Sequence, residues 1–275
     1  MQTFIDYFEV LAPWQKLVWI VICLSIAFLF ESIRPLFTNG FRSWAHTRTN
    51  LVFLSLLVLI NVIVGVITVE LFTWMGVNNW GLLEMVTWPL WVELLASIVI
   101  FDFIAQYCAH FMLHNLKPLW RIHIVHHSDT KVDATTGTRL HPLDFITRET
   151  FAVLAIFIMG APVAFYVLYR IITIAYTYFN HANLRLPFAV DKAISWVFIS
   201  PNTHKFHHHF EEPWTNKNYG NIFSIWDRIF GTFAYGDIND IVYGLDVTDD
   251  TKSDDFGYQM MLPIKNNGRV KVKNT

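Results

Sequence analysis

DFIAQYCAHFMLHNLKPLWRIHIVHH, residues 102–127, is the stretch that decides the fold. It begins inside an apolar run and carries five histidines: His110, His114, His123, His126 and His127. On a helix, residues i, i+3 and i+4 lie on one face, about one turn apart. The stretch therefore predicts helices that present groups of imidazoles at the end of an apolar segment.

The composition indicates a membrane protein. Hydrophobic residues make up 54% of the 275-residue chain and charged residues only 15%, whereas a soluble domain carries about 25% charged residues. The net charge of -2 leaves no basic footprint for nucleic acid. The two cysteines, Cys23 and Cys108, lie in apolar segments and predict no disulfide framework. The acidic N-terminal stretch does not have the pattern of a cleavable signal peptide.

Three apolar runs, at about 14–30, 51–75 and 89–109, are long enough to be membrane segments. Arginines gather in the linker 31–50 and basic residues follow the third run, whereas the loop 76–88 has no Lys or Arg. Because basic loops stay in the cytoplasm, this pattern predicts an outside N-terminus and a cytoplasmic location for both basic segments.

A fourth apolar stretch, 151–179, is interrupted by Gly160-Ala161-Pro162. Because proline breaks helices, we expect a hairpin that enters and leaves the membrane on the same side. We divide the chain into an N-terminal transmembrane region (1–101), a catalytic region that includes this hairpin (102–235) and a polar C-terminal tail (236–275). The predicted fold is all-α: an integral membrane helical bundle with a cytosolic helical cap that carries a histidine-rich dimetal site.

A late cluster, His204, His207 and His208, repeats the spacing of the second early cluster. Neutral imidazole suits Fe, Zn, Cu and Ni. Since a tetrahedral zinc site takes four ligands, eight such histidines indicate two metal ions. We expect the isolated His46 to be an ordinary hydrogen-bonded core residue. His209, one step off the cluster face, is expected at the surface or behind the ligands.

These motifs resemble the fatty acid hydroxylase/sterol desaturase superfamily of membrane oxygenases. The HxxxH box matches His110 and His114, and the two HxxHH boxes match the clusters that begin at His123 and His204. The segments RLHPLD (139–144) and NYGNIFSIWDRIFGTF (218–233) also look like family segments, and 200–233 resembles alkylglycerol monooxygenase-type members. The resemblance implies a non-haem di-iron centre that activates O2 and oxidises a lipid C–H bond.

The resemblance also assigns further site residues. It makes His181 a ninth metal ligand, and Arg185 stands where some hydroxylases have a tenth histidine. Asp102 and Tyr107 match an Asp and a Tyr that precede the first box, and we assign them as catalytic. His141 is expected to support the ligands rather than to bind metal.

Carboxylates near the boxes are candidates to orient the ligand imidazoles. Asp102 is costly in an apolar run without a partner, and on an α-helix we expect it to bond a ligand imidazole. Glu149 is a further candidate. Asp129 and Asp144 are expected to be loop-cap or turn residues. We expect Trp120, Phe206 and Trp214 to serve ordinary packing beside the boxes.

The predicted function is a membrane-bound di-iron oxygenase that hydroxylates or desaturates a fatty acyl, sterol or alkylglycerol lipid. Its expected partners are the lipid, O2, the membrane and an external electron donor: a cytochrome, a ferredoxin or a reduced pterin. The expected location is a bacterial inner membrane or the endoplasmic reticulum, with the metal site on the cytoplasmic side. The alternative is a histidine-rich zinc-binding transporter or sensor. A zinc hydrolase is less favoured, because the chain has no HExxH motif.

Overall fold

The computed structural model describes residues 2–9, 11, 13–38 and 43–265, and these form helices without a β-strand. The α-helices are α1 (Gln2–Glu9), α2 (Pro13–Ile33), α3 (Trp44–Asn78), α4 (Leu90–Phe101), α5 (Ala109–Asn115), α6 (Lys117–His127), α7 (Pro142–Met159), α8 (Val163–His181), α9 (Phe188–Ile194), α10 (Pro201–His207), α11 (Ile225–Ile229) and α12 (Phe256–Lys265). A π-helix, η2 (Asp102–Cys108), joins α4 to α5. The short 3-10 helices are η1 (Leu82–Met85), η3 (Ala134–Thr138), η4 (Trp214–Asn216), η5 (Ile238–Asp240) and η6 (Asp250–Lys252). The predicted all-α class is confirmed.

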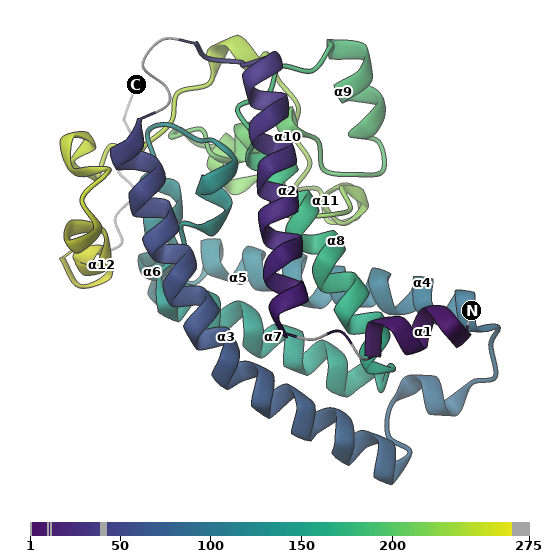
Figure 1. Cartoon of the computed structure of the whole chain (residues 1–275). Coiled ribbons are helices and arrows are strands. Elements are labelled where there is room, and N and C mark those ends of the chain that lie inside the picture. Colours follow the sequence, from purple (N-terminus) through teal and green to yellow (C-terminus); the bar gives the residue numbers. More distant parts are fainter. Residues whose placement is uncertain (1, 10, 12, 39–42, 266–275) are drawn as a thin grey trace.

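Two helical segments, Trp44–Met85 and Leu90–Asn115, are long and apolar enough to cross a membrane, and Leu17–Ile33 is a shorter apolar helix. These segments overlap the three predicted runs. Large apolar side chains on α2 and α3 are exposed, among them Val21, Ile33 and Ile63. A row of exposed aliphatic side chains is favourable against lipid tails and unfavourable against water. Figure 1 shows α3 as a long helix inclined to α2.

The helices α7 and α8 are joined by a sharp turn at the predicted break in the apolar stretch, and the membrane hairpin itself stays a prediction. Gly160 ends α7 in the left-handed conformation at φ 64°, and Pro162 precedes α8. A side chain at Gly160 would collide with the carbonyl oxygen of Trp80, so glycine lets the loop after α3 pack against the hairpin tip. The two arms bring the end of α8 back to the end of the molecule that holds α5 and α6.

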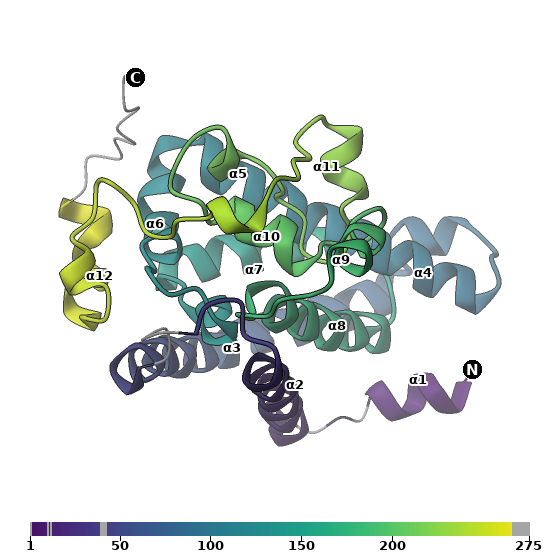
Figure 2. The same cartoon turned by 90° about the horizontal axis from the view of Figure 1, so that it is seen from above.

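The histidine-bearing helices start at well-defined points. Ser200 and Thr203 form a reciprocal capping box at the start of α10, and Pro201 occupies its first turn. Pro118 lies in the first turn of α6. Because these signals fix where each helix begins, they also fix which face carries its histidines. Seen from above, α10 lies at the centre of the molecule, over α7, with α5 and α6 to one side and α8 to another (Figure 2).

The segment predicted as a polar tail contains α12, which packs on α6. Leu262 of α12 is buried with Phe53 and Ile124. The guanidinium of Arg139 is fully buried and donates hydrogen bonds to the carbonyl oxygens of Val125 and Ser253. This arginine ties the helix of the first HxxHH box to the C-terminal segment. The last residues of the predicted tail, 266–275, lie outside the described residues.

Candidate metal centre

All nine predicted ligands come together in two buried groups. One, called here the five-histidine group, contains His110, His114, His123, His127 and His207. The other, the four-histidine group, contains His126, His181, His204 and His208. Within each group the nitrogen atoms that could bind metal lie within 4.8 Å of one another. Each group could hold a metal ion, and the second HxxHH box contributes to both.

Helical spacing explains how the boxes are divided between the groups. His123 and His127 are one turn apart on α6 and face the five-histidine group, whereas His126 faces the other. In the late box, His207 joins the five-histidine group, while His204 and His208 join the four-histidine group. The rings of His127 and His208 stack with centroids 4.7 Å apart, which places the two groups side by side.

Six of the nine imidazoles are oriented by an acceptor on Nδ1. These contacts are His110 to the Tyr219 carbonyl (2.8 Å), His114 to Asn216 Oδ1 (3.3 Å), His123 to Asp144 Oδ2 (2.6 Å), His126 to the Arg139 carbonyl (3.3 Å), His181 to the Thr177 carbonyl (2.7 Å) and His207 to the Lys217 carbonyl (2.7 Å). Because these oxygens only accept, each Nδ1 carries the proton. Each Nε2 therefore has a free lone pair.

In two places, the Nε2 atoms of two histidines face each other, each with a free lone pair. His110 Nε2 lies 3.1 Å from His123 Nε2, and His126 Nε2 lies 3.1 Å from His181 Nε2. In both pairs each Nδ1 is already the donor to an oxygen, so neither Nε2 has a hydrogen to share. Two bare lone pairs at this distance repel, and a shared cation removes the repulsion. The arrangement fits a metal ion in each group.

Other ligand nitrogens are buried without partners. Within the described part of the chain, both ring nitrogens of His127 and of His208 have no hydrogen-bond partner, and neither does Nε2 of His114 or His207. A buried polar atom without a partner costs about 1–3 kcal/mol. Metal coordination would satisfy these atoms, so their burial supports the same assignment.

Burial keeps the imidazoles in the form that binds metal. Desolvation lowers the pKa of His126, His127 and His208 well below the ordinary histidine value, and the neighbouring imidazoles add to the effect. Burial likewise lowers the pKa of His181 to about 4. A neutral imidazole is required for ligation, so these groups are ready to bind metal at neutral pH.

Asp144 orients one ligand, contrary to the expectation that it would be a cap or turn residue. Its carboxylate accepts from His123 Nδ1 at 2.6 Å and from Arg148 Nε at 2.9 Å. Burial alone would raise the pKa of Asp144, but His123 and Arg148 hold it below its ordinary value. The expectation was wrong because four-residue spacing along α7 places Arg148 beside Asp144 and fixes the carboxylate toward α6.

The expected bond between Asp102 and a ligand imidazole is wrong. The buried Asp102 carboxylate instead accepts from the backbone amides of Ile222 and Phe223 and from the Trp226 indole. The reason is the π-helix η2, which begins at Asp102. A π-helix has a wider turn than an α-helix, so counting α-helical turns from His110 gives the wrong face.

Asp102 and Asp227 together hold the loop that follows residue 218. Asp227 accepts from the backbone amides of Tyr219 and Gly220, and Asp102 accepts from those of Ile222 and Phe223. Burial raises the pKa of Asp227 to about 6. Since the Tyr219 carbonyl orients His110, Asp102 acts on the centre through this loop.

Tyr107 also lies outside the two groups. Its hydroxyl is 3.1 Å from the Thr232 hydroxyl, and its ring stacks on Phe103 and Phe230. Its ring makes an edge contact with the ring of Tyr219, whose carbonyl orients His110. The structure therefore brings together the nine histidines but not the two residues assigned as catalytic.

Of the other candidates, Glu149 pairs with Arg170 at 2.6 Å, and this bridge between α7 and α8 replaces the expected contact with an imidazole. His46 is a buried core residue, as expected, and bonds Asp129 at 2.9 Å. Asp129 also accepts from the amide of Lys131, which is the expected turn contact.

His209 and His141 lie outside both groups. His209 Nδ1 accepts from the Val242 amide, and His141 Nδ1 accepts from the Leu143 amide at the start of α7. Trp120 packs over the rings of His114 and His127. Phe206 and Trp214 pack on each other, with ring centroids 5.2 Å apart. Arg185 lines a separate cavity and is not in either histidine group.

The residues that sequence reasoning missed are mostly backbone carbonyls: those of Tyr219, Arg139, Thr177 and Lys217. Carbonyl groups occur at every position and give no sequence signal. Gly137 was also missed, although a side chain there would collide with Thr177 and crowd His181. Its glycine allows η3 to approach the end of α8.

Comparison with known proteins agrees with this geometry. Residues 94–232 match the fatty acid hydroxylase family, and the chain belongs to that family. It is 27% identical over 146 residues to an ornithine lipid hydroxylase of Rhizobium tropici, covering 53% of this chain and 43% of the relative. It is 29% identical over 140 residues to human alkylglycerol monooxygenase, covering 50% and 30%. It is 27% identical over 149 residues to mouse lathosterol oxidase, covering 53% and 47%.

The chain spans less than half the length of each of these three relatives. No solved structure matches it.

Proposed function

We propose that the protein is a membrane-bound, metal- and O2-dependent oxygenase that oxidises a C–H bond of a lipid. The observation that carries this proposal is the pair of adjacent, buried, all-histidine groups in a chain of the fatty acid hydroxylase family. The relatives that it resembles are named a lipid hydroxylase, a monooxygenase and an oxidase. Two apolar helices agree with a membrane location.

We assign two iron ions as the cofactor, with the nine histidines as ligands. Imidazole donors also suit zinc, copper and nickel, so the choice of iron rests on the oxidative chemistry of the family. Bound iron would supply the O2 activation that amino-acid side chains cannot provide. The chain's own residues hold the ligands neutral and oriented and exclude water from the buried groups.

The charge around the centre favours this chemistry. Among the residues the structure describes, Asp144 is the one carboxylate bonded to a predicted ligand. Soluble di-iron bundles instead use several carboxylate ligands. Two metal cations in this site would retain most of their positive charge, which strengthens their pull on an oxygen-derived ligand.

The substrate, product and electron donor are proposed at the level of class. A fatty acyl, sterol or alkylglycerol lipid would enter from the bilayer, and the reaction would be hydroxylation or desaturation. Both need electrons from an external donor: a cytochrome, a ferredoxin or a reduced pterin. We place the centre on the cytoplasmic side of a bacterial inner membrane or of the endoplasmic reticulum, because the basic segments flank it. Asp102 and Tyr107 would support the reaction by holding the loop that carries Tyr219.

The test is to express the chain in cells, measure metal in the purified protein and search the cell lipids for products under 18O2. We expect two irons per chain and a lipid that gains one labelled oxygen or loses two hydrogens. The matched variants are His208→Ala, a predicted ligand, and His209→Gln, the neighbouring histidine outside both groups.

Loss of product in His208→Ala, with product retained in His209→Gln, would support the assignment. A protein that carries zinc, moves zinc across liposome membranes and consumes no O2 would be the transporter alternative and would refute the oxygenase proposal.

A further inference from the structure

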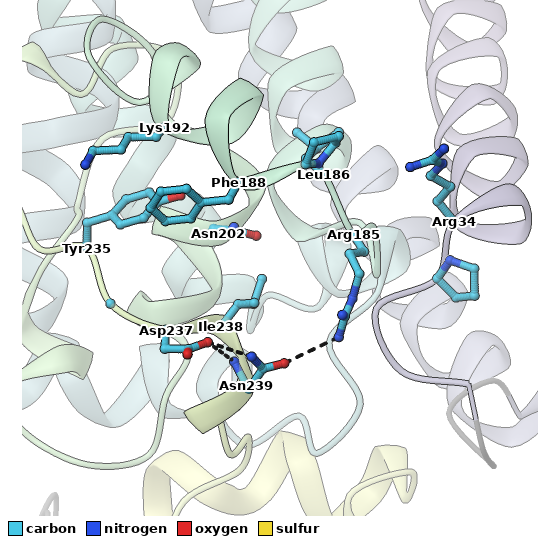
Figure 3. A pocket seen from close by; sticks show the side chains of 13 residues that line it. Arg34, Arg185, Leu186, Phe188, Lys192, Asn202, Tyr235, Asp237, Ile238 and Asn239 are labelled. Atoms are coloured by element: carbon cyan, nitrogen blue, oxygen red, sulfur yellow. Dashed lines mark hydrogen bonds between the residues drawn. The ribbon is translucent and has the colours of Figure 1, made fainter.

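A second site, separate from the histidine groups, lies between the end of α2, α9 and the segment before η5 (Figure 3). It is a cavity of about 860 Å³, and none of the nine histidines lines it. Its lining includes three cations, Arg34, Arg185 and Lys192, but one carboxylate, Asp237. The cavity therefore has an excess of positive charge.

The cations are available to a ligand. Within the described residues, none of the three takes part in an ion pair. Arg185 makes one long hydrogen bond, 3.5 Å, to Asn239 Oδ1, while Asp237 accepts from the amide groups of the same asparagine. Arginine side chains that are exposed and unpaired are suited to bidentate binding of a phosphate.

The backbone that carries the two arginines is fixed. Pro35 and Leu184 form an isolated antiparallel bridge, and the Arg185 amide donates to the Arg34 carbonyl at 2.9 Å. These contacts hold the end of α2 against the segment that follows α8. The two guanidinium groups are thus attached to one rigid connection at the side of the cavity.

The cavity also contains an unsatisfied acceptor. Asn202 is 4% exposed, and its Oδ1 has no hydrogen-bond partner among the residues placed by the structure. The Tyr235 hydroxyl donates to Asp191 at 2.9 Å, so its oxygen is free to accept from the Asn202 amide nitrogen. The Oδ1 of Asn202 is buried below the surface of the cavity, and Figure 3 shows it between the aromatic pair and Arg185.

The position of the cavity indicates where its ligand comes from. The exposed apolar side chains of α2 continue through Leu29, Phe30 and Ile33 and stop at Arg34. Phe188, on the opposite wall, is 62% exposed and has Lys192 over its ring. An apolar helix surface that ends at a cation marks the level of the lipid headgroups.

We propose that this cavity binds the headgroup of an anionic phospholipid. The phosphate lies against Arg34 and Arg185, and the acyl chains follow the exposed face of α2. The ligand class is an anionic phosphodiester lipid, and phosphatidylglycerol is the probe of that class. The proposal does not depend on the oxygenase activity, because the cavity contains no predicted metal ligand.

The test uses the full chain in nanodiscs of phosphatidylcholine that contain a minor fraction of phosphatidylglycerol. Lipid that stays with the protein after mild detergent extraction is measured by mass spectrometry. The test variant is Arg34→Gln/Arg185→Gln. The control, Arg48→Gln/Lys117→Gln, removes two exposed cations outside this cavity.

We expect the native chain to retain phosphatidylglycerol in preference to phosphatidylcholine. The test variant should lose that preference by about tenfold or more, because charge-assisted hydrogen bonds contribute about 1.5–3 kcal/mol. The control should retain it. An equal loss in both variants would mean general surface attraction and would refute the site. Displacement of the retained lipid by millimolar inorganic phosphate would identify a soluble anion as the ligand and would refute the lipid proposal.

Discussion

The five-histidine and four-histidine groups share one buried centre but differ in ligand number and in support. The five-histidine group has an extra imidazole and a ligand held by a carboxylate, Asp144. In the four-histidine group, the oriented ligands His126 and His181 are held by backbone carbonyls alone. A metal with fewer protein ligands keeps more positions open for an outside molecule. Under the proposed two-metal assignment, a metal in the four-histidine group would therefore have more open positions than one in the five-histidine group.

The largest expected effect is loss of a ligand from the smaller group. His208→Ala leaves three imidazoles there, whereas His127→Ala leaves four in the larger group. We expect His208→Ala to lose one metal per chain. Its turnover should fall by more than about 100-fold, which is the upper range for changes to residues that only orient a metal ligand. His127→Ala should retain more metal. Metal analysis and lipid turnover of the two variants would check this, and equal metal loss would remove the distinction between the groups.

Acid should empty both groups. Buried imidazoles have a lower pKa in the folded protein than in the unfolded chain, as for His181 at about 4 against an ordinary 6.5. Below about pH 6.5 the unfolded chain therefore binds more protons, and stability falls as pH falls. For His181 alone the loss by pH 4 is on the order of 3 kcal/mol.

Thermal unfolding of metal-free protein between neutral pH and pH 4 would measure this loss. We expect the melting temperature to decrease steadily with acid, and bound metal to shift the decrease to lower pH. A melting temperature that does not change over this range would contradict the neutral, buried state of the imidazoles.

Asp144→Asn should affect the five-histidine group selectively. The variant keeps the size of the side chain but removes the negative charge that orients His123 and raises its basicity. Loss of such a partner typically lowers metal affinity by about 10–100-fold. Titration with a chelator should release one metal early and the other at the native concentration. Glu149→Gln, which alters the neighbouring carboxylate paired with Arg170, is the control and should release both metals normally.

The smallest effect is expected from Asp102→Asn. Asparagine retains one acceptor oxygen, but the loop amides of Ile222 and Phe223 lose part of their support. We expect a stability loss of about 1–3 kcal/mol and a metal-affinity loss at the five-histidine group smaller than in Asp144→Asn. Abolished turnover with normal stability and normal metal content would show that Asp102 has a direct catalytic role.

Local helical spacing accounts for what could be predicted from the sequence. The boxes around His110, His123 and His204 each lie on one or two short helices, so their faces follow from residue numbers alone. The turn between α7 and α8 followed from Gly160 and Pro162. The family resemblance supplied His181, which no spacing rule indicates.

The errors arose where an irregular helix or long-range contacts decide the geometry. A π-helix changed the direction of Asp102, and a partner on another helix determined the role of Asp144. The packing of α12 on α6 depends on the buried Arg139, whose partners lie far apart in the sequence. Such pairings leave no periodic pattern.

The facing Nε2 lone pairs of His110–His123 and His126–His181 have a consequence for the life of the protein in the cell. A newly made chain without the proposed cations would keep mutually repelling atoms at its centre. We expect such a chain to open there more often, to be cleaved faster by proteases and to be removed by quality control. Under the proposed iron assignment, iron starvation would then lower the amount of this protein as well as its output.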